Sequence, residues 1–345
     1  MTDLSRPHLA RLPDTDESAS GVIIGLNAVL AAIREDGPVV LCVRTGDQAV
    51  PALPYGAFSP EHHRTFELGL REFVHDQAGM QLGYVEQLYT FGDKGREAPS
   101  AAFEGGSASD RIISVGYLAL TPAPAPVELA NTAWLSWYDF FPWEDWRAGE
   151  PAILERHILP AFQRWIEAAP DRATSARRRA RVRLAFGYED AGWEEERVLD
   201  RYELMYEAGL VTEAWRDEND TTQCATGVPM ISDHRRILAT AIGRLRGKLR
   251  YRPVIFEMVS DTFTLLDLQR GVESIIGFPL HKQNFRRGIE NAGLAVKTGT
   301  MSSDTGGRPA ALYRLNRDPQ SATRDRTIQG LTLPRLRQGP SLDLG

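Results

Sequence analysis

The chain has 345 residues, of which 42% are apolar and 25% charged, a composition typical of a globular protein with two or three domains. Its net charge of -6 argues against a protein that binds polyanions over its whole surface. Two cysteines, Cys42 and Cys224, cannot build a disulfide framework or a thiolate metal site, so we expect a reducing cytoplasm. The longest apolar run, at residues 21–33, is too short for a membrane span and follows acidic residues, unlike a signal peptide.

The first part of the chain predicts a mixture of strands and one helix. Residues 1–20 are polar and contain proline, which predicts a mobile arm. Residues 21–44 predict a hairpin with its turn at 35–38, and residues 53–80 predict a turn at Tyr55 and Gly56 followed by a helix. Residues 84–91 and 111–120 alternate as strands do, on either side of a polar loop. This order predicts an α+β sandwich.

Helices dominate from residue 151 onwards. The clearest one lies between Trp193 and Leu210, and an amphipathic helix follows at residues 234–251. Four arginines at residues 177–181 could touch DNA, but we favour a solvated helix or a contact with the acidic run at 194–196. Dense aromatic residues precede this region, and we expect them at an interdomain packing surface rather than in a ligand site: Trp134, Trp137, Phe140, Phe141, Trp143 and Trp146.

Residues 261–316 form the most informative segment. Its apolar residues recur at helical spacing and are Leu265, Leu268, Val272, Ile275 and Ile276. Gly277 and Pro279 end this run, and a second, basic helix is predicted at residues 280–291. Two short strands follow, joined by a Gly-rich turn that carries an arginine. Helix, turn, basic helix and hairpin together predict a winged helix.

The second of these helices has the side chains that recognition of DNA requires. Phe285, Ile289 and Ala292 share one face, so Gln283 and Arg287 point the opposite way. Arg pairs with guanine or phosphate, and Asn or Gln with adenine. Residues 230–316 hold fourteen Lys and Arg against seven Asp and Glu. A solvated basic face is the alternative. The predicted DNA-contact residues are Lys282, Gln283, Asn284, Arg286, Arg287, Lys297 and Arg308.

Several motifs, in this order along the chain, resemble Nudix-related transcriptional regulators of NAD metabolism of the NrtR type: YVEQLYTFGD, RIISVGYLAL, FFPWEDW, DHRRILATAIGRLRGKL, and NFRR with GGRPA. The stretch LPYGAFSPEHHRTFELGLREF is most similar to the NadQ-like subgroup. The resemblance covers residues 21–146 and 231–316. It implies a homodimer that binds operator DNA through paired winged helices while its Nudix-like domain senses a nucleotide, with repression strengthened when NAD or ATP is plentiful. Residues 151–227 have no counterpart in the common pattern.

The Nudix box of this chain departs from the form G-x5-E-x7-R-E-U-x-E-E-x-G-U, in which clustered glutamates hold Mg²⁺ against the phosphates of a substrate. With Arg71 and Glu72 as anchor, the next two acidic positions hold His75 and Asp76, and the distal Glu position holds His63. A register shifted by one residue does not restore the carboxylates. We therefore predict no catalytic residues and no metal site. Two alternatives stay open: a bifunctional Nudix pyrophosphohydrolase acting on ADP-ribose or NAD, and an adaptor whose winged helix contacts proteins.

A nucleotide can bind without being hydrolysed. Arg44 and Arg111 at strand ends offer phosphate pairing, while Glu86, Tyr89 and Tyr117 offer ribose hydrogen bonds and a stacking surface. An alternative interpretation is equally good: the tyrosines belong to the core of the sandwich, and the arginines are solvated residues at strand ends. The expected effector is NAD, ATP or ADP-ribose, with no catalytic cofactor.

We thus predict an α+β protein with an N-terminal Nudix-like α/β/α sandwich, a helical insertion and a C-terminal winged helix-turn-helix domain. The predicted boundaries are a mobile arm at 1–20, a Nudix-like effector domain at 21–150, a helical insertion at 151–229, a linker helix at 230–251, a winged-helix domain at 252–318 and a flexible tail at 319–345. The predicted function is repression of NAD biosynthesis genes by a cytoplasmic homodimer. Its partners are double-stranded operator DNA and an adenine nucleotide, with no membrane.

Overall fold

A computed structural model describes residues 21–44, 50–96, 110–122, 131–218, 220, 222, 224–250, 254–302 and 309–316. The predicted N-terminal arm and C-terminal tail lie outside these residues. Among the residues described, no helix combines the length and the apolar character needed to cross a bilayer.

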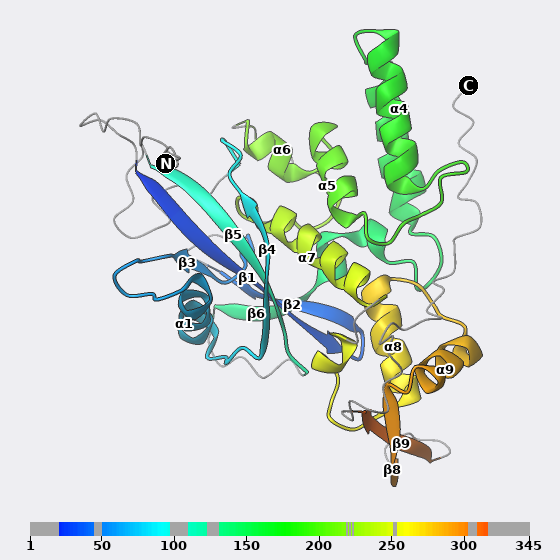
Figure 1. Cartoon of the computed structure of the whole chain (residues 1–345). Helices are drawn as coiled ribbons and strands as arrows, with labels where there is room; N and C mark the ends of the chain where they lie inside the picture. Colours follow the sequence, from blue (N-terminus) through cyan, green and yellow to red (C-terminus); the bar gives the residue numbers. More distant parts are fainter. Residues whose placement is uncertain are drawn as a thin grey trace, which may run out of the picture.

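A six-stranded sheet organises the N-terminal part of the chain (Figure 1). Its strands are β1 (Val22–Arg34), β2 (Gly37–Val43), β3 (Tyr55–Ala57), β4 (Tyr84–Phe91), β5 (Arg111–Leu120) and β6 (Thr132–Ser136). The order is β4-β5-β1-β2-β6, and β3 pairs with β1. The β1–β5 pair is parallel and the other pairs are antiparallel. The long strand β1 therefore joins both halves of the sheet.

The helices are α1 (Phe66–Ala78), α2 (Trp137–Phe140), α3 (Leu159–Glu167), α4 (Arg172–Phe186), α5 (Val198–Glu207), α6 (Thr212–Arg216), α7 (His234–Lys248), α8 (Leu265–Ile276) and α9 (Lys282–Asn291). Short 3-10 turns, η2 (Pro142–Glu144) and η4 (Val254–Glu257), and a π turn, η3 (Leu154–Ile158), connect some of them. A second sheet has the order β7-β9-β8, with β7 (Phe263–Thr264), β8 (Ala295–Ser302) and β9 (Ala310–Leu315).

Both faces of the first sheet are covered, because successive side chains of a strand point to opposite sides. In β1, Leu26 and Leu30 belong to an apolar cluster with Leu70 of α1. Val29 belongs to a second, larger cluster with Ile237 of α7. Helix, sheet and helix thus form the three layers of the predicted sandwich, and the predicted α+β class is confirmed.

The predicted and observed elements agree at two strands of the first sheet and differ at weaker signals. Strands β4 and β5 have the predicted bounds, and α7 is three residues shorter than the predicted helix at 234–251. The turn predicted at Tyr55 and Gly56 is wrong, because these residues form β3 and pair with Asn27 and Leu26 of β1. The aromatic cluster packs between parts of the fold, since Trp146 stacks on Phe278 just beyond α8.

Candidate nucleic-acid interface and nucleotide site

Helix α8 is the support of the winged helix, and local signals fix both of its ends. Thr264 accepts a hydrogen bond from the Asp267 amide at 3.1 Å, and the Asp267 carboxylate accepts one from the Thr264 amide at 3.0 Å. This reciprocal pair is a capping box. Gly277, with a φ of 82°, ends the helix in the left-handed conformation that favours glycine. Between these ends, Leu268 and Val272 are fully buried.

Helix α9 presents a polar face to solvent. Phe285 and Ile289 are buried and hold the helix against the core. The predicted contact residues of this helix are all exposed: Lys282, Gln283, Asn284, Arg286 and Arg287. Among the residues that the structure describes, Lys282, Arg286 and Arg287 form no ion pair with a carboxylate. Their charge is therefore free for an anionic partner.

The wing lies beside this helix at the end of the molecule opposite α4 (Figure 1). Lys297 is exposed on β8, opposite Tyr313 of β9. The predicted wing residue Arg308 lies outside the described residues. Helix α9 and strand β8 thus lie at the same end of the molecule.

Hydrogen bonds from three different segments attach α8 to the rest of the fold. The Tyr138 hydroxyl donates to the Ser274 carbonyl at 2.7 Å, the Trp146 amide to the Gly277 carbonyl at 2.8 Å, and the Arg246 Nε to the Ile275 carbonyl at 2.8 Å. These bonds hold the C-terminal half of α8 against α2, η2 and α7. The orientation of the winged helix therefore depends on the packing of the sandwich.

A buried ionic cluster lies next to this attachment. Glu144 is 1% exposed, and Arg201 and Arg246 are 0% exposed. The Glu144 carboxylate accepts hydrogen bonds from Arg201 Nε at 2.6 Å, from Arg201 Nη2 at 2.9 Å and from Arg246 Nη1 at 2.5 Å. Burial alone raises the pKa of Glu144, but the two guanidinium groups outweigh it, so the pKa lies below its ordinary value. One carboxylate thus joins η2, α5 and α7. No sequence signal indicated this cluster.

Glu86, a predicted effector residue, is instead held by α7. Its carboxylate accepts a hydrogen bond from the Tyr84 hydroxyl at 2.6 Å, pairs with Arg244 at 3.1 Å and pairs with Lys248. Burial raises the pKa of Glu86, but Lys248 and Tyr84 outweigh it, and the pKa is lowered. Glu86 therefore connects β4 to α7, on the face of the sheet opposite α1.

The other predicted effector residues differ in their surroundings. Tyr117 is 5% exposed and packs in the apolar cluster on the α1 side, whereas Tyr89 is 61% exposed. Arg111 donates from its guanidinium to the Gly92 carbonyl, and Arg44 is exposed just after β2. Glu86 and Tyr117 thus lie on opposite faces of the sheet, so the five side chains do not all line one cleft. The sequence alone does not show which face of a strand a given helix covers.

Helix α1 carries most of the residues at the predicted Nudix-box positions. His63 is buried against Gly69, its Nδ1 accepts a hydrogen bond from the Ser59 amide at 3.0 Å, and its Nε2 lies 3.5 Å from the Glu72 carboxylate. Arg71 pairs with Glu67 at 2.8 Å. Within the described part of the chain, no three His, Cys, Asp or Glu side chains are grouped to hold a metal ion.

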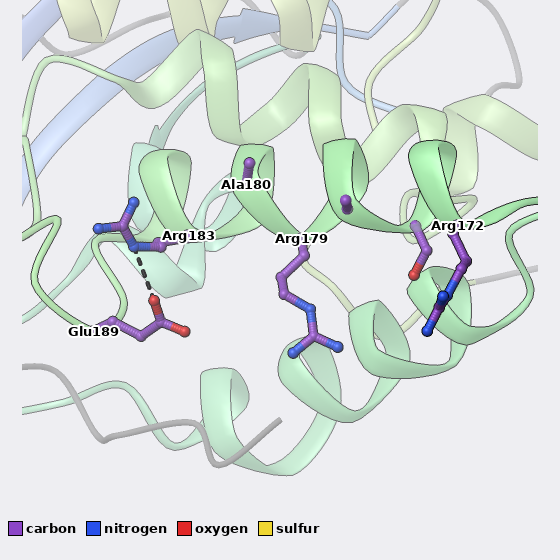
Figure 2. A pocket seen from close by; sticks show the side chains of 7 residues that line it. Arg172, Arg179, Ala180, Arg183 and Glu189 are labelled. Atoms are coloured by element: carbon purple, nitrogen blue, oxygen red, sulfur yellow. Dashed lines mark ion pairs between the residues drawn. The ribbon is translucent and has the colours of Figure 1, made fainter. Parts of the chain in front are cut away.

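Three arginines of α4, namely Arg172, Arg179 and Arg183, point to the same side of that helix (Figure 2). Arg183 pairs with Glu189 at 2.9 Å, and Arg181 pairs with Glu207 at 2.5 Å. Arg181, in the run at 177–181, therefore pairs with α5 and not with the acidic run at 194–196. Glu194 pairs within its own turn, and the next two glutamates pair with the end of α7.

Comparison with known proteins supports the winged helix and the overall fold. Residues 255–315 match the family described as the NrtR DNA-binding winged helix domain. A curated protein of Acinetobacter baylyi, the ADPR responsive transcriptional repressor NtrR, is 36% identical over 94 residues, which are 27% of this chain and 37% of that protein. The chain thus matches well under half the length of this relative.

Among solved structures, Shewanella oneidensis NrtR in complex with a 27mer DNA has a TM-score of 0.50 at 20% identity, over 87% of this chain and 96% of that one. A MutT/nudix family protein of Enterococcus faecalis has a TM-score of 0.48 at 14% identity, over 89% of each chain. The winged-helix match and the Shewanella likeness confirm the predicted resemblance to Nudix-related regulators of the NrtR type, with a Nudix-like fold followed by a winged helix.

Proposed function

We propose that this regulator of the NrtR type represses transcription by binding operator DNA through α9 and the β8–β9 wing. The observation that carries the proposal is the division of α9 into a buried face with Phe285 and Ile289 and an exposed face with unpaired cations. A recognition helix inserts such a polar face into the major groove, where Arg and Gln pair with base edges. Arg286 and Arg287 are the central contacts in this proposal, and Lys297 contacts a backbone phosphate.

The regulated genes in this proposal are those of NAD biosynthesis, and the effector is an adenine nucleotide bound by the Nudix-like part of the chain. ADP-ribose is the first candidate, because the curated relative is described as ADPR responsive. NAD and ATP are the other candidates. Arg44 and Arg111 are the proposed phosphate contacts, because Glu86 is occupied by α7 and Tyr117 is buried. A homodimer, with one winged helix on each half-site, is part of the proposal.

The nucleotide is bound without being hydrolysed in this proposal. The His63 imidazole sits beside the Glu72 carboxylate, at the position where a hydrolase of this type has a second glutamate. A neutral or protonated imidazole there does not add to the negative charge that a hard divalent cation needs. The alternative is a bifunctional pyrophosphohydrolase, and release of AMP from ADP-ribose in the presence of Mg²⁺ distinguishes it.

The proposed DNA contact is tested by fluorescence anisotropy with labelled DNA from upstream of the NAD biosynthesis genes. Arg286→Ala/Arg287→Ala is expected to weaken binding at least tenfold, since one bidentate base contact contributes about 1–3 kcal/mol. Arg164→Ala/Arg172→Ala is the matched control, because these two exposed arginines lie on α3 and α4. Equal affinity of both double variants would exclude α9 as the recognition helix.

A further inference from the structure

A groove of 840 Å³ lies between the sheet and the winged helix, away from α1 and from the exposed face of α9. One wall is the tip of the β1–β2 hairpin with Ile33, Arg34 and Glu35. The other wall is the outer face of α8 with Arg270 and the segment before it, which includes Val259 and Phe263. Its size is that of a pocket for a small organic molecule, and such pockets concentrate where two parts of a fold meet.

The cationic side chains that line this groove differ in whether they already pair with a carboxylate of the protein. Among the residues described, the guanidinium groups of Arg34 and Arg270 form no hydrogen bond and no ion pair. Arg147 is committed to Asp145, at 2.8 Å. Two free guanidinium groups therefore face the groove from opposite walls.

Two of the three carboxylates in the groove are already hydrogen-bonded. Asp267 caps α8, and Glu273 accepts hydrogen bonds from the Leu280 amide at 2.7 Å and from Gln269 at 2.8 Å. Glu35 is the third, at the exposed hairpin tip. The groove thus offers two free cations against one free carboxylate.

Apolar side chains line the groove as well. Phe263 is 4% exposed, and Ile33 and Val259 are partly buried. The δ1 methyl group of Ile33 would lie 3.3 Å from a Cβ added at Gly271, so hairpin and helix are already in close contact. The hydrogen bonds that fix α8 to the sandwich also fix the walls, and a preformed site loses little order on binding.

We propose that this groove binds a small organic anion with a flat apolar body and a phosphate or carboxylate group. The guanidinium groups of Arg34 and Arg270 pair with the anionic group, and the side chains of Ile33, Val259 and Phe263 cover the apolar body. The site is separate from the proposed phosphate contacts Arg44 and Arg111, because Arg34 lies at the hairpin end of β1, whereas Arg111 pairs with Val22 at its other end. A ligand there touches the sandwich and α8 at the same time, so it would bias the position of the winged helix. That consequence rests on the proposed function, whereas binding itself does not.

Binding is tested on the full chain without DNA, by methyl NMR with ¹³C-labelled isoleucine and phenyl phosphate as the probe. The Ile33 methyl signal is expected to shift and to saturate, while Ile112, which is 0% exposed and packs with Ile23 in a separate cluster of the sheet, stays in place. Benzoate shows whether a carboxylate suffices, and neutral benzamide is expected to bind at least tenfold more weakly than phenyl phosphate.

Arg34→Ala/Arg270→Ala is expected to weaken phenyl phosphate binding at least tenfold, and Glu35→Gln is expected to tighten it. Arg164→Ala/Arg172→Ala, the control pair on α3 and α4, should leave the affinity unchanged. An Ile33 signal that does not move, or a groove double variant that binds as the wild type does, would overturn the proposal. Because no DNA is present, failure here leaves the proposed repressor function intact, and failure of DNA binding leaves this site intact.

Discussion

Replacement of Glu144 by Gln tests whether the buried ionic cluster holds the fold together. The substitution keeps the shape of the side chain and removes its charge, so Arg201 and Arg246, both 0% exposed, lose their counter-ion. Breaking a buried pair costs about 3–5 kcal/mol. Arg201 keeps hydrogen bonds to two carbonyl groups at 2.9 and 3.0 Å, and Arg246 keeps three at 2.8, 3.1 and 3.4 Å. We therefore expect a loss near the lower limit, about 3 kcal/mol.

Urea unfolding followed by tryptophan fluorescence measures this loss. Asp145→Asn is the matched control, because its pair with Arg147 is about one-third exposed and such pairs contribute below about 1 kcal/mol. If Glu144→Gln lost no more stability than Asp145→Asn, the structural role of the cluster would be refuted. Since the pKa of Glu144 is lowered in the folded state, its contribution is present above the unfolded pKa of about 4.3 and lost as the pH falls through the folded value. The difference between wild type and Glu144→Gln should therefore shrink in acid.

Other predictions concern the cap of α8, the wing, the assembly and the nucleotide. Gly277→Ala should destabilise by more than about 1–2 kcal/mol in thermal unfolding, because its φ is 82° and a Cβ there would collide with the Glu144 carbonyl, whereas Gly79→Ala, with a φ of 66° and open space, should lose less. Lys297→Ala should weaken DNA binding on all sequences alike and lower the salt slope by about one, as titrations at several salt concentrations would show. Light scattering at micromolar concentration should give twice the 38.4 kDa of one chain, and a monomeric mass would exclude the dimer. Calorimetry should detect ADP-ribose binding, with chromatography showing no Mg²⁺-dependent release of AMP; release at enzyme-like rates would favour the hydrolase instead.

Much of the fold follows from local patterns in the sequence. Strands β4 and β5 are rich in β-branched and aromatic residues and are bounded by polar loops, and α8 has a capping threonine, helical apolar spacing and a terminal glycine. The winged helix is predictable for the same reason: its two helices and its hairpin each have a local sequence pattern that is typical of that element. β3 was missed because it has three residues, one of them Gly56, and becomes a strand only by pairing with β1.

The ionic contacts could not be predicted, because they join residues that are far apart in the chain. Glu144 lies 57 residues from Arg201 and 102 from Arg246. Each of these arginines has the local sequence of an exposed helical residue, and only the packing of α5 and α7 around η2 buries them. The ion pairs of Glu86 could not be predicted either, because the sequence of β4 does not show that Arg244 and Lys248 of α7 lie beside it.

The central claim is that a nucleotide controls the affinity of this protein for its operator. Anisotropy titrations of labelled operator DNA, repeated with saturating ADP-ribose, NAD or ATP, test it directly. We predict that at least one nucleotide changes the dissociation constant by about fivefold or more, and that operator DNA changes the affinity for that nucleotide by the same factor. Tight operator binding that none of the three nucleotides alters would contradict the account.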